Sequence, residues 1–263
     1  MTKRVAMAIA AHPDDIEFMM AGTLLQLGQA GYEIHLMNMA NGCLGSATED
    51  RETTIARRRE EAQDAAKSMG AHWHAPVAND LEIFYTYDLL EKVTAVIREV
   101  QPDILLVPSP EDYIEDHMNA CRVAVSSAFC RGMPNFVTNP PREAIEKELT
   151  LYHALPYGLQ DGLRRVIKPG QYVDITSVMV QKRAALACHR SQKEWLDVSQ
   201  GLDSYLQTME DMSRTVGEWS GLFQFAEGWR RHSHLGFCAP DADPLKDALG
   251  ELHKVEVVLD PAQ

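Results

Sequence analysis

Four consecutive residues near the start of the chain include side chains that bind metal ions and transfer protons. His12, Pro13, Asp14 and Asp15 directly follow an apolar run at residues 5–11. A histidine and a carboxylate three positions apart on a turn are suitable ligands for a first-row divalent metal, and catalytic zinc sites have three protein ligands plus a water. Asp14 would then be placed to take a proton from that water. The alternative role for either aspartate is to cap the helix that follows.

A second polar segment offers the third ligand. Residues 108–117 follow the apolar residues 104–107 and end in His117. Ligands of open parallel α/β sheets bind at the carboxyl ends of the strands, so the loops after two such strands meet at one edge of the sheet. We therefore expect His117 to join His12 and Asp15. The alternative is a surface histidine near the acidic start of a helix.

Strands and helices alternate along the chain in the way that positions such loops. This alternation predicts an α/β fold, a Rossmann-like three-layer α/β/α sandwich with a mostly parallel sheet and the active site at the carboxyl ends of the strands. The loop after the first strand lacks G-x-G-x-x-G, which argues against dinucleotide binding. The predicted strands are 5–11, 33–39, 104–107, 152–155 and 172–175, and the predicted helices are 18–30, 51–69, 87–100, 116–130, 176–190 and 203–215.

Size and composition set further limits. The length of 263 residues predicts one domain, 1–263, with a core at about 4–192 and a helical or irregular C-terminal appendage, 193–263, packed on it. With 25 basic and 38 acidic residues, the net charge of −13 argues against nucleic-acid partners. There is no apolar run of about 20 residues for membrane insertion. Five scattered cysteines and no signal peptide predict a cytoplasmic protein.

Several segments together carry a resemblance to a known family. They are Ala-His-Pro-Asp-Asp at 11–15 with Ile-Glu-Phe after it, and segments 22–24, 41–46, 58–70, 112–117 and 182–192. In these residues the chain resembles the LmbE-like or PIG-L family of metal-dependent N-acetylglucosaminyl deacetylases. The resemblance covers about residues 4–192.

The resemblance implies a role for each matching residue. It implies that water activated by the metal and deprotonated by Asp14, the general base, attacks the carbonyl of an N-acetyl amide. It also implies Zn²⁺ as cofactor, with Fe²⁺ as the alternative, a small N-acylated, sugar-like substrate, and a homo-oligomer, either trimer or hexamer. The implied metal ligands are His12, Asp15 and His117, and the implied substrate-binding residues are Arg58, Asp80 and Asp112.

One position departs from the family pattern. The family reads His-x-Asp-His at the third ligand, where this chain has Ile114, Glu115, Asp116 and His117. The missing histidine would stabilise the oxyanion or protonate the leaving amine, and losing one oxyanion donor costs about 10²–10³ in rate. We expect Asp116, deprived of that partner, to orient His117 or bind water. The candidates for the missing catalytic group are His189, which is favoured, and His153, Tyr113 and the pair His232/His234.

The leading hypothesis is therefore a zinc-dependent deacetylase or amidase acting on a non-peptide carbon–nitrogen bond. Ile114 leaves open a non-catalytic family member that binds metal and a glycan-like ligand. Two histidines and one carboxylate are also the ligand set of non-haem iron oxygenases, although those enzymes have a different structural setting.

Overall fold

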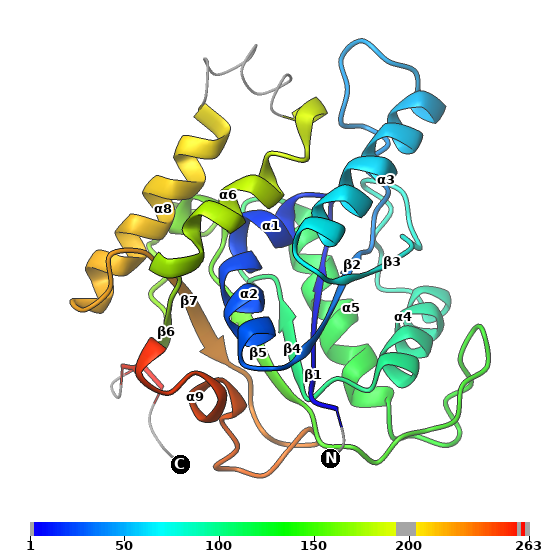
Figure 1. Cartoon of the computed structure of the whole chain (residues 1–263). Coiled ribbons are helices and arrows are strands. Elements are labelled where there is room, and N and C mark those ends of the chain that lie inside the picture. Colours follow the sequence, from blue (N-terminus) through cyan, green and yellow to red (C-terminus); the bar gives the residue numbers. More distant parts are fainter. Residues whose placement is uncertain (1–2, 193–203, 257–258, 261–263) are drawn as a thin grey trace.

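The protein contains one eight-stranded sheet, in the order β3-β2-β1-β4-β5-β7-β6-β8 (Figure 1). The computed structural model describes residues 3–192, 204–256 and 259–260. Strands β3, β2, β1, β4 and β5 are parallel, and β7, β6 and β8 continue the sheet with antiparallel pairs. The strands are β1 (Val5–Ala10), β2 (Glu33–Asn38), β3 (His72–His74), β4 (Ile104–Val107), β5 (Thr150–Ala154), β6 (Gln171–Asp174), β7 (Ala226–Arg231) and β8 (His253–Val255).

Helices cover both faces of this sheet (Figure 1). Because side chains alternate along a strand, Ala6 and Ala8 of β1 join the apolar layer on one face, and Met7 and Ile9 join the layer on the other. The predicted three-layer α/β fold with a mostly parallel sheet is thus confirmed. The helices are α1 (Asp15–Met19), α2 (Ala21–Gln29), α3 (Arg51–Ser68), α4 (Tyr87–Val100), α5 (Glu115–Cys130), α6 (Met179–Leu186), α8 (Ser204–Ser220) and α9 (Pro244–Leu249).

The segment predicted as one helix at 18–30 is two helices. The helix is interrupted at Met20, whose φ of −132° is not helical. The break leaves backbone N–H groups free at the start of α2, and those of Gly22 and Thr23 donate to the buried carboxylate of Glu227 at 2.8 and 2.7 Å. A negative charge at a helix N-terminus is favourable, so this distant residue determines where α2 begins.

Two further helix predictions are corrected in their bounds. The 176–190 segment begins with a 3₁₀ turn at 176–178 and continues as α6 only to Leu186. The 203–215 helix corresponds to α8, which runs to Ser220, and residue 203 lies outside the described residues.

The C-terminal region is not an appendage. Strand β7 lies between β5 and β6, and β8 forms the sheet edge beside β6. The sequence Ala-Glu-Gly-Trp-Arg-Arg of β7 has no apolar run, so its strand was not predicted. Two of its buried side chains have partners distant in sequence: Lys182 Nζ lies 2.6 Å from Glu227 Oε1, and Trp229 Nε1 donates to Thr23 Oγ1 at 2.9 Å.

The topology brings two polar loops to one edge of the sheet. The loop after β1 contains His12, and the loop after the neighbouring β4 leads into α5 and His117. Among the described residues, no helix has both the length and the apolar character needed to cross a membrane.

Candidate metal centre and active site

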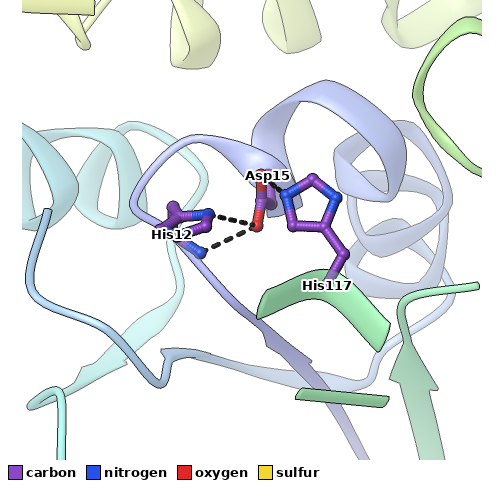
Figure 2. Close-up of side chains that lie close together, drawn as sticks. All are labelled: His12, Asp15 and His117. Atoms are coloured by element: carbon purple, nitrogen blue, oxygen red, sulfur yellow. Dashed lines mark hydrogen bonds and ion pairs between the residues drawn. The ribbon is translucent and has the colours of Figure 1, made fainter. Parts of the chain in front are cut away.

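His12, Asp15 and His117 come together at this edge and are called here the catalytic cluster (Figure 2). Each residue offers one ligand atom, and these atoms lie within 4.8 Å of one another. Asp15 Oδ2 accepts the backbone N–H of His12 at 2.7 Å, and Asp15 Oδ1 lies 3.3 Å from His117 Nε2. The turn after β1 therefore orients the Asp15 carboxylate, and the first turn of α5 supplies the facing imidazole.

A carboxylate stands behind each histidine of the cluster. Asp112 Oδ1 lies 3.2 Å from His117 Nδ1, and Asp116 Oδ2 lies 3.0 Å from His12 Nε2. Partners of this kind orient metal-binding imidazoles and fix their tautomer. Two oriented imidazoles and a carboxylate are a donor set that fits a divalent transition metal.

These contacts revise two predicted roles. Asp116 orients His12 rather than His117, and its Oδ2 also accepts the backbone N–H of Leu81 at 2.6 Å. Asp112, predicted to bind substrate, is the partner of His117, and the same oxygen accepts the N–H groups of Tyr113 and Ile114. Spacing alone did not reveal which carboxylate serves which histidine.

Carboxylates dominate the electrostatics of the cluster. Burial lowers the pKa of His117, but the charges of Asp15 and Asp112 outweigh it and raise that pKa to about 10. Burial raises the pKa of Asp15, whereas His117 and His12 outweigh it and hold this pKa well below its usual range. In the metal-free cluster, protonated imidazole thus supplies the positive charge that a bound cation would provide.

Asp14 lies beside the cluster in a strained conformation. Its φ of 111° falls in the left-handed half of conformational space, which non-glycine residues at functional sites sometimes adopt. Asp14 Oδ2 accepts a 2.7 Å hydrogen bond from the Tyr205 hydroxyl and lies 3.4 Å from Arg58 Nη2. Burial raises the pKa of Asp14 in spite of the nearby Arg58 charge. A carboxylate with a raised pKa is suited to accept a proton near neutral pH.

The cluster and Asp14 open onto a cavity of about 500 Å³. Its lining includes apolar and aromatic side chains as well as the Asp14, Asp15, Asp80 and Asp112 carboxylates. Among the described lining residues, Arg58 supplies the single lysine or arginine charge, and this side chain is 2% exposed. Carboxylates therefore outnumber lysine and arginine side chains in the described lining.

The structure does not place His189 where a catalytic group must be. Its side chain is completely buried, does not line the cavity, and has Nε2 3.4 Å from Glu17 Oε2. His153 and His232 hydrogen-bond to each other at 2.9 Å, also away from the lining. Of the candidates for the missing group, Tyr113 does line the cavity, and its ring centroid is 5.9 Å from that of His117.

Asp80 and Arg58 line the cavity and hydrogen-bond to backbone groups around it. Both Asp80 oxygens accept backbone N–H groups, from Gly42 and Leu44, at 2.8 Å each. The carboxylate that was predicted to bind a substrate hydroxyl is therefore hydrogen-bonded to the protein backbone. Arg58 Nη2 donates to the Pro13 carbonyl. A Cβ at Gly42 would lie 2.9 Å from Arg58 Nε, and the φ of +75° there also favours glycine.

Tyr205 is a residue of the candidate site that the sequence analysis did not identify. It belongs to α8, lines the cavity and donates to Asp14. It lies 191 positions from Asp14, in a region with no recognised motif, so no local signal pointed to it.

Comparisons with known proteins indicate the family of this chain. Residues 7–129 match the PIG-L model, described as GlcNAc-PI de-N-acetylase. The chain is 30% identical over 233 residues to the diacetylchitobiose deacetylase of Thermococcus kodakarensis, covering 85% of this chain and 81% of the relative. It is 28% identical to the 4-oxalmesaconate hydratase of Pseudomonas putida, covering 73% and 75% of the two chains.

A solved structure has the same fold. The N,N'-diacetylchitobiose deacetylase of Pyrococcus horikoshii superimposes with a TM-score of 0.71 at 25% identity, over 89% of this chain and 85% of that one. The chain therefore belongs to the PIG-L, or LmbE-like, deacetylase family.

Proposed function

We propose that this protein is a zinc-dependent deacetylase that hydrolyses the N-acetyl amide of a small amino-sugar substrate. The observation that carries the proposal is the position of Asp14. Its carboxylate faces the same cavity as the three candidate ligands, is held by Tyr205, and has a raised pKa. A base beside a metal site is the arrangement that hydrolysis of an amide by water requires.

Different residues would activate the amide and transfer the protons during hydrolysis. A divalent cation held by His12, Asp15 and His117 would polarise the amide carbonyl and lower the pKa of a nearby water. Asp14 takes one proton from the attacking water and returns it to the amine nitrogen as the carbon–nitrogen bond breaks. Acetate and a free amine are the products.

Tyr113 is our candidate for the hydrogen-bond donor to the oxyanion, a role that the apolar Ile114 cannot fill. Burial raises the pKa of its phenol, and Asp15 and Asp112 raise it further, so the hydroxyl keeps its proton at neutral pH. A neutral donor on the cavity wall can hydrogen-bond to the oxyanion that develops on the amide oxygen.

The charge of the cavity favours a neutral substrate that yields an amine. Four carboxylates face it, and Arg58 is already engaged by Pro13 and Asp14. The Thermococcus and Pyrococcus relatives are named for deacetylation of diacetylchitobiose, a neutral acetylated sugar. This substrate class therefore suits both the relatives and the electrostatics.

Asp14→Asn tests the proposed base. The variant keeps the size and position of the side chain, so we expect it to bind one metal equivalent at the catalytic cluster while the release of acetate from N,N'-diacetylchitobiose falls by about 10²–10⁴. Asp88→Asn is the matched control, because Asp88 is exposed and pairs with Lys92 on α4. Full activity of Asp14→Asn would disprove the role of Asp14. No acetate release from any acetylated sugar by wild-type protein with bound zinc would favour a non-catalytic member.

Hydration of a carbon–carbon double bond is the second candidate, because the chain covers most of the Pseudomonas hydratase. That activity also adds water, but to an anionic polycarboxylate. The four cavity carboxylates would repel such a substrate. Loss of absorbance of a conjugated oxo-tricarboxylate on incubation with the protein, with no acetate released from acetylated sugars, would establish hydration in place of deacetylation.

A further inference from the structure

A second group of metal-binding side chains lies at the other end of the parallel strands. Glu33 and His35 belong to the start of β2, and His72 belongs to the start of the edge strand β3. These three residues, called here the edge cluster, each offer a ligand atom within 4.8 Å of the others. Because β2 and β3 are parallel with His35 beside His72, the backbone itself holds the two imidazoles together.

The distances suit a tetrahedral metal ion. Glu33 Oε1 lies 2.9 Å from His72 Nε2 and 3.2 Å from His35 Nε2. Ligands at 2.0–2.1 Å from a tetrahedral zinc are about 3.3 Å apart, so small shifts of the side chains would admit an ion between these atoms. The rings of His35 and His72 are stacked, with centroids 4.7 Å apart and an interplanar angle of 27°, and the Nε2 atom of each lies near the same Glu33 oxygen.

His74 supplies the support that a metal-binding histidine needs. His35 Nδ1 lies 2.9 Å from His74 Nε2. When His35 Nδ1–H donates to His74, the opposite nitrogen of His35 is free of its proton and faces Glu33. A metal-ligating histidine commonly donates its other N–H in this way.

We propose that Glu33, His35 and His72 form a second site for a divalent transition metal such as zinc, positioned by His74 and separate from the catalytic cluster. His35 pairs with Met7, three residues before the end of β1, and the two clusters share no residue, so each site can be removed separately. Lys3 contacts the other side of Glu33, and this lysine side chain is 68% exposed, so it is free to move away when the cation binds. The ion would tie the three-residue edge strand β3 to β2.

Metal stoichiometry tests the second site. The protein is stripped with a chelator and titrated with Zn²⁺ and Co²⁺, with bound metal measured by elemental analysis and the cobalt absorption spectrum. We expect two equivalents for wild type and one each for Asp15→Ala and His72→Ala. We expect none for the double variant. His72 is exposed on an edge strand, so its replacement is compatible with folding.

A matched variant and a second measurement keep the outcome clear. His234→Ala removes a histidine outside both clusters and should retain two equivalents. Zn²⁺ should raise the melting temperature of Asp15→Ala protein, and this shift should vanish when His72→Ala is added. A single equivalent in wild type, or a second equivalent that survives His72→Ala, would overturn the proposal, whether or not the protein is a deacetylase.

Discussion

The two histidine–carboxylate clusters use the same types of side chain in opposite surroundings. The catalytic cluster lies in loops after β1 and β4, opens onto a cavity and has the Asp14 carboxylate beside it. The edge cluster lies within β2 and β3 and, among the described residues, lines none of that cavity. A ligand triad is therefore insufficient for chemistry. The cavity and a neighbouring base distinguish the site that can turn over a substrate from one that can only hold an ion.

The clusters also differ in the charge around their histidines. Asp15 and Asp112 raise the pKa of His117 to about 10, in opposition to its burial. At the edge, burial and the neighbouring His72 lower the pKa of His35, and burial and His35 lower that of His74 to about 4. His117 therefore carries a proton in the absence of metal, whereas the surroundings of His35 and His74 favour their neutral forms.

The largest expected effect distinguishes the clusters by activity. Asp15→Ala removes the one carboxylate among the three candidate metal ligands. Deacetylase turnover should then fall by about 10³ or more, because several kcal/mol of transition-state stabilisation are lost with the metal. Acetate release and metal content measured on one sample check this. Activity that persists after loss of the catalytic equivalent would remove the difference between the clusters. Asp88→Asn, at an exposed position paired with Lys92, serves as the control that retains both activity and metal.

The donor on the cavity wall is the next test. Tyr113→Phe should lower kcat by about 10², because an oxyanion donor is lost. Adding Ile114→His to this variant places an imidazole at the position where family members have one, and it should restore part of kcat. Tyr85→Phe, whose hydroxyl contacts Ser126 at an exposed site, is the control. An unchanged kcat for Tyr113→Phe would show that another group stabilises the oxyanion.

A smaller effect concerns the carboxylate behind His117. Asp112→Asn keeps the shape of the side chain but removes its charge, so zinc affinity of the catalytic cluster should weaken about 10–100-fold. Competition with a chromophoric chelator measures the change. The edge cluster should keep its affinity, and Asp88→Asn should leave both sites unaltered. Equal weakening at both clusters would point to a general loss of structure.

The smallest signal is the proton released on metal binding. At pH 7.5 the catalytic cluster should release about one proton, because His117 must lose its proton to bind metal. The edge cluster should release fewer, because the pKa of His35 is lowered there. Calorimetric titration of His72→Ala and Asp15→Ala in two buffers of different ionisation enthalpy separates the two values. Affinity of the catalytic cluster should rise with pH up to about 10. Equal proton release from both variants would contradict the assigned charges.

The same pKa shift links pH to stability in the metal-free protein. His117 binds its proton more tightly when folded, with a pKa raised to about 10 from 6.5. Its stabilising contribution is therefore fully present below pH 6.5 and is lost as the pH rises toward 10.

The sequence predicted the parts of this molecule that depend on local pattern. His12, Asp15 and His117 were placed together because apolar strands precede their loops and parallel strands end at one edge. The role of Tyr205 depends on a contact with Asp14 across 191 positions, which no spacing encodes. Strand β7 was missed because its charged residues are buried by distant partners such as Lys182 and not by an apolar pattern. His189 was misplaced because a matching segment does not indicate which side chains face the cavity: this residue follows the end of α6 at Leu186, and its side chain is completely buried.

The insertion of β7 between β5 and β6 has a consequence for synthesis of the chain. About 70 residues separate β5 from its partner β7, so the ribosome synthesises β7 several seconds after β5 at ordinary elongation rates. During that interval β6 also has no neighbour, since both of its partners come later. The nascent chain therefore exposes an unpaired strand edge, whose free N–H and C=O groups can pair with other chains. A messenger truncated before codon 226 would leave this edge permanently open.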